Sequence, residues 1–346
     1  MKSNWSVLKA ILGSSTILFL ALPASCRKPA YQSLEKSFIL MDTYVSMRIF
    51  FREGDKQRWQ GALERAAERM VRIDSLCDNY RPDSEVSRIN GRAGEGWVKV
   101  SPEVSDLVQR SLQISDLAHG RFDITVGPLM QGYGFGRKEN LDILRPEEIA
   151  PLLQKIDYHL VQVAGDRVAL QKTGMAIDLG GVAKGYAIDA AIRELTASGV
   201  TDAQVDVGGE VSTLCSPLTA GKRHIYVRNP QQRDKFYGRF RMDQGCVATS
   251  GDYERFFMFD GKRYHHILNP KTGLPAWGCR SVTIKANDNT LCDGLSTAVF
   301  VLGPEQGMEL VERLADVEAI ILFEKEGRLQ HRVSSGLQSA FEVLSR

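Results

Sequence analysis

A pair of adjacent glycines near the middle of the chain is flanked by charged residues that could bind an anion. Asp178 lies two residues before Gly180, and Lys184 lies three residues after Gly181. Glycines leave backbone N–H groups uncovered by side chains, so a bulky anion can approach closely. A helix predicted to follow the turn would add its N-terminal partial positive charge. By itself the stretch over 177–189 favours an ordinary strand-to-helix turn, because it matches neither common phosphate-binding glycine pattern.

The same pattern returns one predicted helix later, where Asp206 precedes a second glycine pair, Gly208 and Gly209. Two strands that each end in Asp-x-Gly-Gly, with a helix between them, predict a βαβ unit with both turns at one sheet edge. Ligands of open α/β sheets bind at such strand ends. A pair of ordinary turns is the alternative interpretation.

A pair of oxygen-bearing side chains near the C-terminal end could hold a metal ion. Residues 290–302 are predicted to form a helix, so Asp293 and Thr297 lie at positions i and i+4 on one face. Two hard oxygen ligands suit Mg²⁺, which takes few protein oxygens and keeps waters and substrate phosphates. A surface Asp–Thr pair without a metal is the alternative.

Two adjacent histidines, His265 and His266, end a predicted strand within a dense polar stretch over 248–273. Neighbouring residues of a strand point to opposite faces, so only one of the two can face a given site. A histidine is more often a packed or surface residue than a catalyst. The tight NPKTG turn over 269–273 could hold such a ring in place.

Two further residues each have two interpretations. Asp123 lies in an apolar run over 120–128 that is typical of a strand. Its carboxylate is either exposed at a strand end or buried with a partner, and the second case often marks a site. Tyr80 lies in a polar loop over 78–90, where it either packs or offers a stacking surface to a flat ligand.

The elements that must position these residues follow from hydrophobic periodicity and turn signals. Helices are predicted over 56–77, 102–118, 146–155, 182–198, 290–302 and 304–315. A single strand is predicted over 38–51 and another over 280–285, a hairpin over 158–171, and a strand that ends in a glycine pair over 203–211. Two strands joined by a polar loop are predicted over 224–245, a hairpin turn at Asp260 and Gly261, and a last hairpin that turns at 325–327. This mixture predicts an α+β fold in which mixed sheets pack against helices.

Composition excludes several classes of protein. The 346 residues are 43% hydrophobic and 25% charged, which is ordinary for a globular protein. The net charge of +2, without a basic stripe, argues against binding of nucleic acid. Five cysteines follow Cys26, without a C-x-x-C motif, so neither a metal knot nor a disulfide framework is predicted. Most are interpreted as small core residues, and a disulfide stays possible in an exported protein.

The N-terminus has the features of an export signal. Lys2 and Lys9 are followed by an apolar run over 10–22 that is too short for a stable membrane span. Small residues then precede Cys26, as in a bacterial lipoprotein signal whose Cys is lipidated. Pro23 departs from that pattern, so ordinary signal cleavage is the alternative. The predicted division is a signal peptide over 1–26, a tether over 27–36 and one domain over 37–346.

Eight segments in chain order resemble the ApbE family, the FAD:protein FMN transferases. They are MDTYVSM, DNYRPDSEVSRIN, GRFDITVGPL, IDLGGVAKGYAID, DVGGEV, TSGDYERFF, YHHILNPKTG and CDGLSTAVFVLG. Eight segments in the right order are far more specific than any one of them. Asp42 stands where many members have Gly, and Asp206 stands where many have Asn, so no role is assigned to Asp206.

The resemblance implies a flavin transferase domain over 37–346. Members transfer the FMN half of FAD, through its phosphate, to a Thr or Ser hydroxyl of an acceptor protein, releasing AMP and using Mg²⁺. The implied FAD contacts are Met41, Tyr80, Arg121, Phe122, Asp123, Asp178, Lys184 and Ile267. The implied metal site is Asp293 and Thr297, completed by backbone oxygens near Gly181 and Ser296.

The chemistry of such a transfer fits these residue types. A hydroxyl is a poor nucleophile toward a charged pyrophosphate, so a metal ion and Lys184 would neutralise charge as it develops. A general base would add roughly 10²–10⁴-fold to the rate. His266 is the first candidate for this base and His265 is the second.

Two other functions compete with the transferase. An exported FAD pyrophosphatase would use water in place of the protein hydroxyl and yield FMN and AMP. A flavin-binding lipoprotein would only hold the flavin, although that would not need a metal at the scissile bond. The expected partners of the transferase are FAD, exported redox proteins with a target Thr or Ser, and a membrane reached through the N-terminal lipid. The expected location is the periplasmic side of a membrane, with the inner membrane favoured over the outer.

Overall fold

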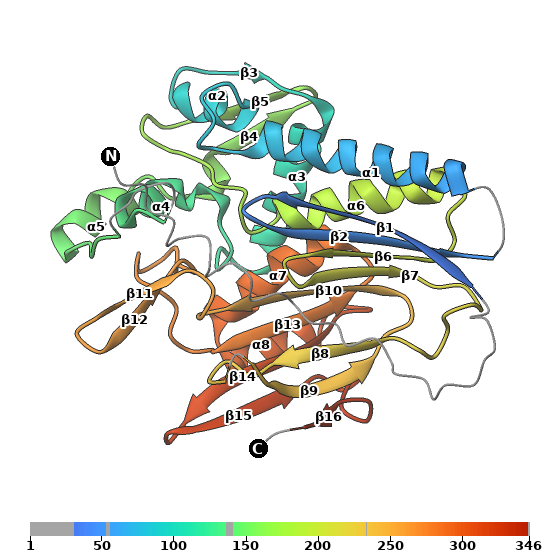
Figure 1. The fold of residues 1–346 in the computed structure, drawn as a ribbon. Coiled ribbons are helices and arrows are strands. Elements are labelled where there is room, and N and C mark those ends of the chain that lie inside the picture. Colours follow the sequence, from blue (N-terminus) through green and yellow to red (C-terminus); the bar gives the residue numbers. More distant parts are fainter. Residues whose placement is uncertain (1–30, 53–55, 136–140, 233, 345–346) are drawn as a thin grey trace, which may run out of the picture.

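A large antiparallel sheet forms the centre of the protein (Figure 1). The computed structural model describes residues 31–52, 56–135, 141–232 and 234–344. Among these residues, eight strands follow the order β1-β2-β6-β7-β10-β13-β14-β15, and each neighbouring pair is antiparallel. Their bounds are β1 Gln32–Leu40, β2 Thr43–Phe51, β6 Ala203–Val207, β7 Glu210–Leu214, β10 Gly245–Gly251, β13 Ser281–Ala286, β14 Glu318–Lys325 and β15 Arg328–Val333.

Helices pack against this sheet and against one another. The main ones are α1 Lys56–Cys77, α3 Pro102–Leu117, α6 Ala183–Ala197, α7 Asn289–Leu302 and α8 Pro304–Val311. Helix α1 lies against α6, α7 lies against β10 and β13, and α8 lies against β14 (Figure 1). In α1 the side chains of Leu63, Met70 and Ile73 recur at helical spacing and are buried, which is the periodicity that predicted the helix.

A second, smaller sheet covers the other face of the central one. It consists of β16 Glu342–Val343, β9 Phe236–Arg241 and β8 His224–Arg228. Strand β14 shows both faces at once: Ile321 belongs to the main core, whereas its neighbours Ile320 and Leu322 belong to a separate core with Phe240. Successive strand residues point to opposite faces, so a strand covered on both faces is a continuous apolar run.

The remaining elements surround one end of the central sheet. They are α2 Glu85–Gly91, β3 Val98–Lys99, the 3-10 helix η1 Ile124–Val126, α4 Gly127–Tyr133, α5 Pro146–Leu153, η2 Tyr158–Leu160, β4 Val161–Ala164, β5 Arg167–Leu170, β11 Phe256–Phe259 and β12 Lys262–His265. The predicted α+β class is confirmed, as are the six helices and the hairpins β4–β5, β11–β12 and β14–β15.

The predicted βαβ unit is wrong. Residues 177–179 are not a strand, because Ile177 is held by the side chain of Asn90 and the Asp178 N–H donates to the Ile124 carbonyl. Strands β6 and β7 are antiparallel and joined by Gly208 and Gly209, both with positive φ. Two glycines between two strands favour a tight hairpin, so the second Asp-x-Gly-Gly segment joins two antiparallel strands and does not lead from a strand into a helix.

Three further predictions need correction. The single strand over 38–51 is the β1–β2 hairpin, which turns at Met41 and Asp42 with φ of 50° and 57°. Asp123 is not in a strand; it caps η1. The predicted tether over 27–36 is too long, because β1 begins at Gln32 and pairs with β2 along its length.

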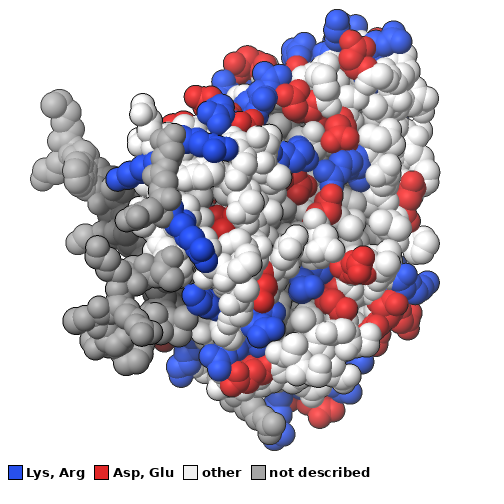
Figure 2. All heavy atoms as spheres, turned by 90° about the vertical axis from the view of Figure 1, so that its right-hand side faces the viewer, with Lys and Arg blue, Asp and Glu red and all other residues white. Residues whose placement is uncertain are grey.

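The signal peptide over 1–26, Cys26 and the first part of the tether lie outside the described residues. None of the helices in the described part of the chain is long and apolar enough to cross a membrane. On the face shown in Figure 2, acidic and basic side chains are interspersed, and neither sign dominates a broad area.

Candidate functional site

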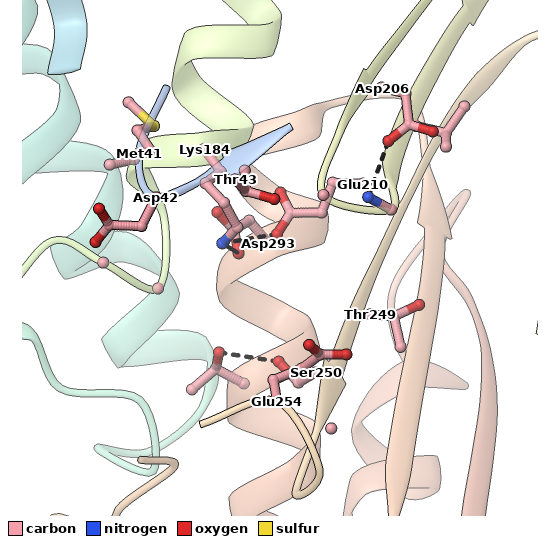
Figure 3. A pocket seen from close by; sticks show the side chains of 18 of the residues that line it. Met41, Asp42, Thr43, Lys184, Asp206, Glu210, Thr249, Ser250, Glu254 and Asp293 are labelled. Carbon is pink, nitrogen blue, oxygen red and sulfur yellow. Dashed lines mark hydrogen bonds and ion pairs between the residues drawn. The ribbon is translucent and has the colours of Figure 1, made fainter. Parts of the chain in front are cut away.

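A cavity of about 1340 Å³ opens between the β1–β2 turn, the start of α6, the end of β10 and the segment after β12 (Figure 3). Most of the residues implied by the family resemblance line it. They are Met41, Tyr80, Arg121, Phe122, Asp123, Asp178, Gly181, Lys184, His266, Ile267, Asp293 and Thr297. Residues from six separate segments therefore meet around one space.

Two predicted site residues do not line this cavity. Ser296 is buried behind it, where its hydroxyl donates to the Asp293 carbonyl at 2.8 Å. His265 is fully buried, and its ring meets Phe300 edge to face. Burial lowers the pKa of His265 to about 3, so its ring is neutral. The structure therefore brings only one of the two histidines to the cavity.

His266 is half-buried at the cavity wall. Its Nδ1 lies 3.2 Å from the carbonyl oxygen of Arg255. If Nδ1 carries the proton and donates to that carbonyl, Nε2 is the basic nitrogen. Burial, together with the Arg255 charge, lowers the pKa of His266 to about 4, so the ring is neutral near pH 7 and free to accept a proton.

Helices α6 and α7 hold the site together by capping each other. Asp293 on α7 accepts a hydrogen bond at 3.0 Å from the Gly185 N–H in the first turn of α6. In return, Asp189 on α6 accepts from the Thr290 N–H and hydroxyl at the start of α7. A carboxylate at a helix N-terminus satisfies free N–H groups and complements the helix dipole. Both carboxylates are thereby fixed in place.

The two helices can approach this closely only because residue 185 is glycine. A Cβ at Gly185 would lie 2.2 Å from the Asn289 carbonyl oxygen and 2.9 Å from the Asp293 Cβ. Real Cβ atoms do not come so near to backbone atoms, so any side chain would push α6 and α7 apart. The glycine in the AKGYA segment is thus required by packing at the site.

Lys184 lies between two buried carboxylates (Figure 3). Its Nζ is 2.7 Å from Glu210 Oε1 and 3.5 Å from Asp293 Oδ1. Burial opposes the charged form of Lys184, but the charges of Asp293 and Glu210 outweigh it and raise the Lys184 pKa. Burial and the Asp293 charge also raise the pKa of Glu210, which the Lys184 charge only partly offsets. The raised pKa of Glu210, about 8, keeps this carboxyl mostly protonated near pH 7, so the Lys184 charge is balanced mainly by Asp293.

The donor set next to this cluster fits a small divalent cation. Thr297 Oγ1 lies 3.2 Å from Ser250 Oγ, and a Cβ at Gly181 would lie 3.6 Å from Thr297 Oγ1. Within the described ranges no three His, Cys, Asp or Glu side chains cluster as metal ligands. One carboxylate from Asp293, one hydroxyl and backbone oxygens match Mg²⁺, which keeps waters and phosphates, better than Zn²⁺.

Both Asp-x-Gly-Gly turns are closed by their own aspartates. The Gly180 N–H donates to Asp178 Oδ1 at 2.8 Å, and the Gly209 N–H donates to Asp206 Oδ1 at 2.8 Å. The expectation that the Gly180 N–H is free for an anion is therefore wrong. A short Asp side chain readily hydrogen-bonds the backbone a few residues on. Burial raises the pKa of Asp206 to about 6.

The carboxylate of Asp123 is buried and hydrogen-bonded, which is the second of the two interpretations that the sequence allowed. It accepts from the Thr125 N–H and hydroxyl and from the Tyr158 N–H. Burial raises its pKa, and these three hydrogen bonds work in the opposite direction. Asp123 therefore joins η1 to η2 at the cavity wall.

Several residues at the cavity were not singled out from the sequence. Glu210 follows the second glycine pair directly, inside a segment that was recognised as a whole. Asn79 donates to Asp178 at 3.0 Å, and Arg255 forms an ion pair with Asp42 at 3.7 Å across the cavity mouth. The sequence positions of Glu210, Asn79 and Arg255 indicated no role, because each role depends on a residue far away in sequence.

The fold and the large polar cavity, with Lys184, Glu210 and Asp293 in its lining, define a protein that can take up a large polar ligand. The chain belongs to the ApbE family, whose model matches residues 41–321. It is 30% identical over 300 residues to the FAD:protein FMN transferase of Vibrio cholerae, covering 85% of this chain and 88% of that protein. It is 32% identical over 302 residues to the FAD:protein FMN transferase of Treponema pallidum, covering 82% of each. The ApbE protein of Thermotoga maritima superimposes with a TM-score of 0.81 at 34% identity, over 89% of this chain and 99% of that one.

Proposed function

We infer that this protein is an FAD:protein FMN transferase. It transfers the FMN moiety of FAD, through a phosphoester bond, to a Thr or Ser hydroxyl of an acceptor protein and releases AMP. The observation that carries this inference is the cluster of Lys184, Glu210 and Asp293 inside a cavity of about 1340 Å³ in an ApbE-family chain. That volume exceeds the roughly 300–1,000 Å³ of sites for drug-sized ligands, as a dinucleotide requires.

Each polar group has a part in this reaction. Mg²⁺, held by Asp293 and Thr297 with backbone oxygens near Gly181 and Ser296, would supply charge neutralisation at the FAD pyrophosphate. Lys184 offers its ammonium group to the same phosphates, so that negative charge developing on the departing AMP is balanced.

The acceptor hydroxyl attacks the phosphorus of the FMN half, and the bond from that phosphorus to the AMP oxygen breaks. The hydroxyl proton passes to Nε2 of His266, whose ring is neutral because burial lowers its pKa. The half-buried ring of Tyr80 and the buried ring of Phe122 offer apolar surface to a flat isoalloxazine.

The same proposal includes export. Residues 1–26 have the composition of a lipoprotein signal, with Cys26 as the lipidated residue. A lipid anchor on the periplasmic side would bring the domain to exported redox proteins that carry FMN on a Thr or Ser. Cell fractionation and labelling with a radioactive fatty acid test this part, and a soluble cytoplasmic chain with unmodified Cys26 would contradict it.

Mass spectrometry of an acceptor tests the reaction. The full chain in detergent would be mixed with FAD, Mg²⁺ and a flavin-accepting domain that carries a target Thr. A mass gain of one FMN on that Thr, lost with EDTA or with Asp293→Ala, is expected. Glu68→Ala is the matched control, because it removes an exposed carboxylate on α1. Free FMN and AMP without labelling would favour the FAD pyrophosphatase, and intact bound FAD would favour the flavin-binding lipoprotein.

A further inference from the structure

Two buried cysteines from different elements are in direct contact. Cys246 is in β10 and Cys292 is in the first turns of α7, 46 residues further along the chain. Each is 1% exposed, and their Sγ atoms are 3.0 Å apart. Their other close polar contacts are backbone carbonyls, with Cys246 Sγ 3.3 Å from the Ala286 oxygen and Cys292 Sγ 3.6 Å from the Cys246 oxygen.

This contact is close to the geometry of a covalent bond. A disulfide places its sulfurs about 2.05 Å apart, so the two atoms would have to approach by about 1 Å. Strand β10 and helix α7 already pack directly on each other, so the two elements do not have to be brought together for the bond to form. Cys215, by contrast, has its thiol 3.8 Å from the Thr219 hydroxyl.

The pair joins the two elements that form one wall of the site. Cys292 directly precedes Asp293, and β10 also carries Ser250, whose hydroxyl is 3.2 Å from Thr297 Oγ1 on α7. A covalent bond between Cys246 and Cys292 would fix the separation of these two elements on the protein side of the predicted metal site.

We propose that Cys246 and Cys292 form a disulfide that ties β10 to the start of α7. Each thiol loses its hydrogen, one S–S bond forms, and the two electrons and two protons pass to a disulfide-containing oxidant, which is reduced to a dithiol. Access to such an oxidant rests on the proposed export to an oxidising compartment. The disulfide itself does not rest on the proposed transferase activity. Because both thiols are buried in the folded protein, the exchange takes place before folding is complete.

Peptide mapping tests the bond directly. Trypsin should release residues 242–255 with Cys246 as their only cysteine, and residues 286–313 with Cys292 as theirs. The full chain, denatured without reductant and alkylated, should yield these two peptides as one linked species that dithiothreitol separates. The peptide over 73–88, which holds Cys77 and continues past the uncleaved Arg81–Pro82 bond, should be alkylated in the same sample. Recovery of both peptides as alkylated thiols would overturn the proposal.

The experiment is run on two samples, so that export and pairing are separated. One sample is the chain purified from the cell envelope, and the other is reduced chain refolded in detergent with oxidised and reduced glutathione. Linkage in both is expected. Linkage only after refolding supports the disulfide and contradicts the proposed export. Alkylated thiols after refolding contradict the disulfide itself.

Thermal unfolding gives a second test that tolerates weakly folding variants. Dithiothreitol should lower the Tm of the oxidised protein by several degrees, because reduction of the disulfide increases the conformational entropy of the unfolded chain. The variant with Cys246→Ser and Cys292→Ser should show no such shift. Cys279→Ser, at another buried cysteine, is the matched control and should keep the shift. A shift that persists in the double variant would refute the assignment.

Discussion

Replacing Lys184 with methionine would leave the carboxylates of Glu210 and Asp293 without the ammonium group between them. The side chains of Glu210 and Asp293 are 6% and 4% exposed, and that of Lys184 is 28% exposed. Removing one partner of a buried ion pair costs about 3–5 kcal/mol, because the remaining charge is left uncompensated. The opening of the cavity to water places the expected loss near the lower end, about 3 kcal/mol in the free energy of unfolding.

Urea unfolding at pH 8 in EDTA would measure this loss. At that pH Glu210 is driven toward its charged form despite its raised pKa, and EDTA removes any metal ion that could replace the lysine charge. Lys325→Met is the matched control, because Lys325 is exposed at the end of β14, and it should change stability by less than about 0.5 kcal/mol.

A double-mutant cycle decides whether the electrostatic reasoning is correct. Glu210→Gln added to Lys184→Met removes the like charge, so the double variant should recover most of the stability that Lys184→Met loses. Asp293 would still keep its hydrogen bond from the Gly185 N–H. If the two single effects simply add, Lys184 acts through packing and the charge argument is refuted.

Three other outcomes are expected. Burial and the neighbouring Asp293 charge raise the pKa of Glu210, so the folded state binds the Glu210 proton more tightly than the unfolded state does. The free energy of unfolding is therefore highest below the ordinary pKa of Glu and falls as the pH rises toward the raised pKa of folded Glu210. Urea midpoints from pH 5 to 9 should show that fall in the wild type and less of it in Glu210→Gln. Gly185→Ala should lower the free energy of unfolding by about 3 kcal/mol, because the added Cβ forces α6 away from α7. Gly91→Ala, where the added Cβ meets open space, should change that free energy little, and equal losses in the two variants would contradict the packing argument. His266→Ala should slow FMN transfer by about 10²–10⁴-fold, while His265→Ala should lower stability more than rate; an unchanged rate in His266→Ala would remove it as the base.

The parts of the fold that depend on neighbouring residues were predictable. The apolar residues of α1 recur every three or four positions, and the Gly165 and Gly261 turns are typical of short hairpins, so these elements were predicted near their true bounds. The shared face of Asp293 and Thr297 follows from the α7 periodicity in the same way. Each of these features is a property of a few consecutive residues.

The sheet order and the details of the site were not predictable in this way. The segment around Asp178 has strand-like residues but is held by Asn90 and Ile124, which are far away in sequence. Which histidine faces the cavity also depends on the register of β12 against its surroundings, which alternation alone leaves undecided.

The sequence by itself therefore determined the long helices, most hairpins, the α+β class and the motifs that identify the family. Only the tertiary structure decided that Glu210 shares Lys184 with Asp293 and that α6 and α7 cap each other. These contacts join residues as far apart as Gly185 and Asp293, which are 108 positions apart. Local periodicity carries no information about such contacts, because they exist only after the helices have packed on the sheet and on each other.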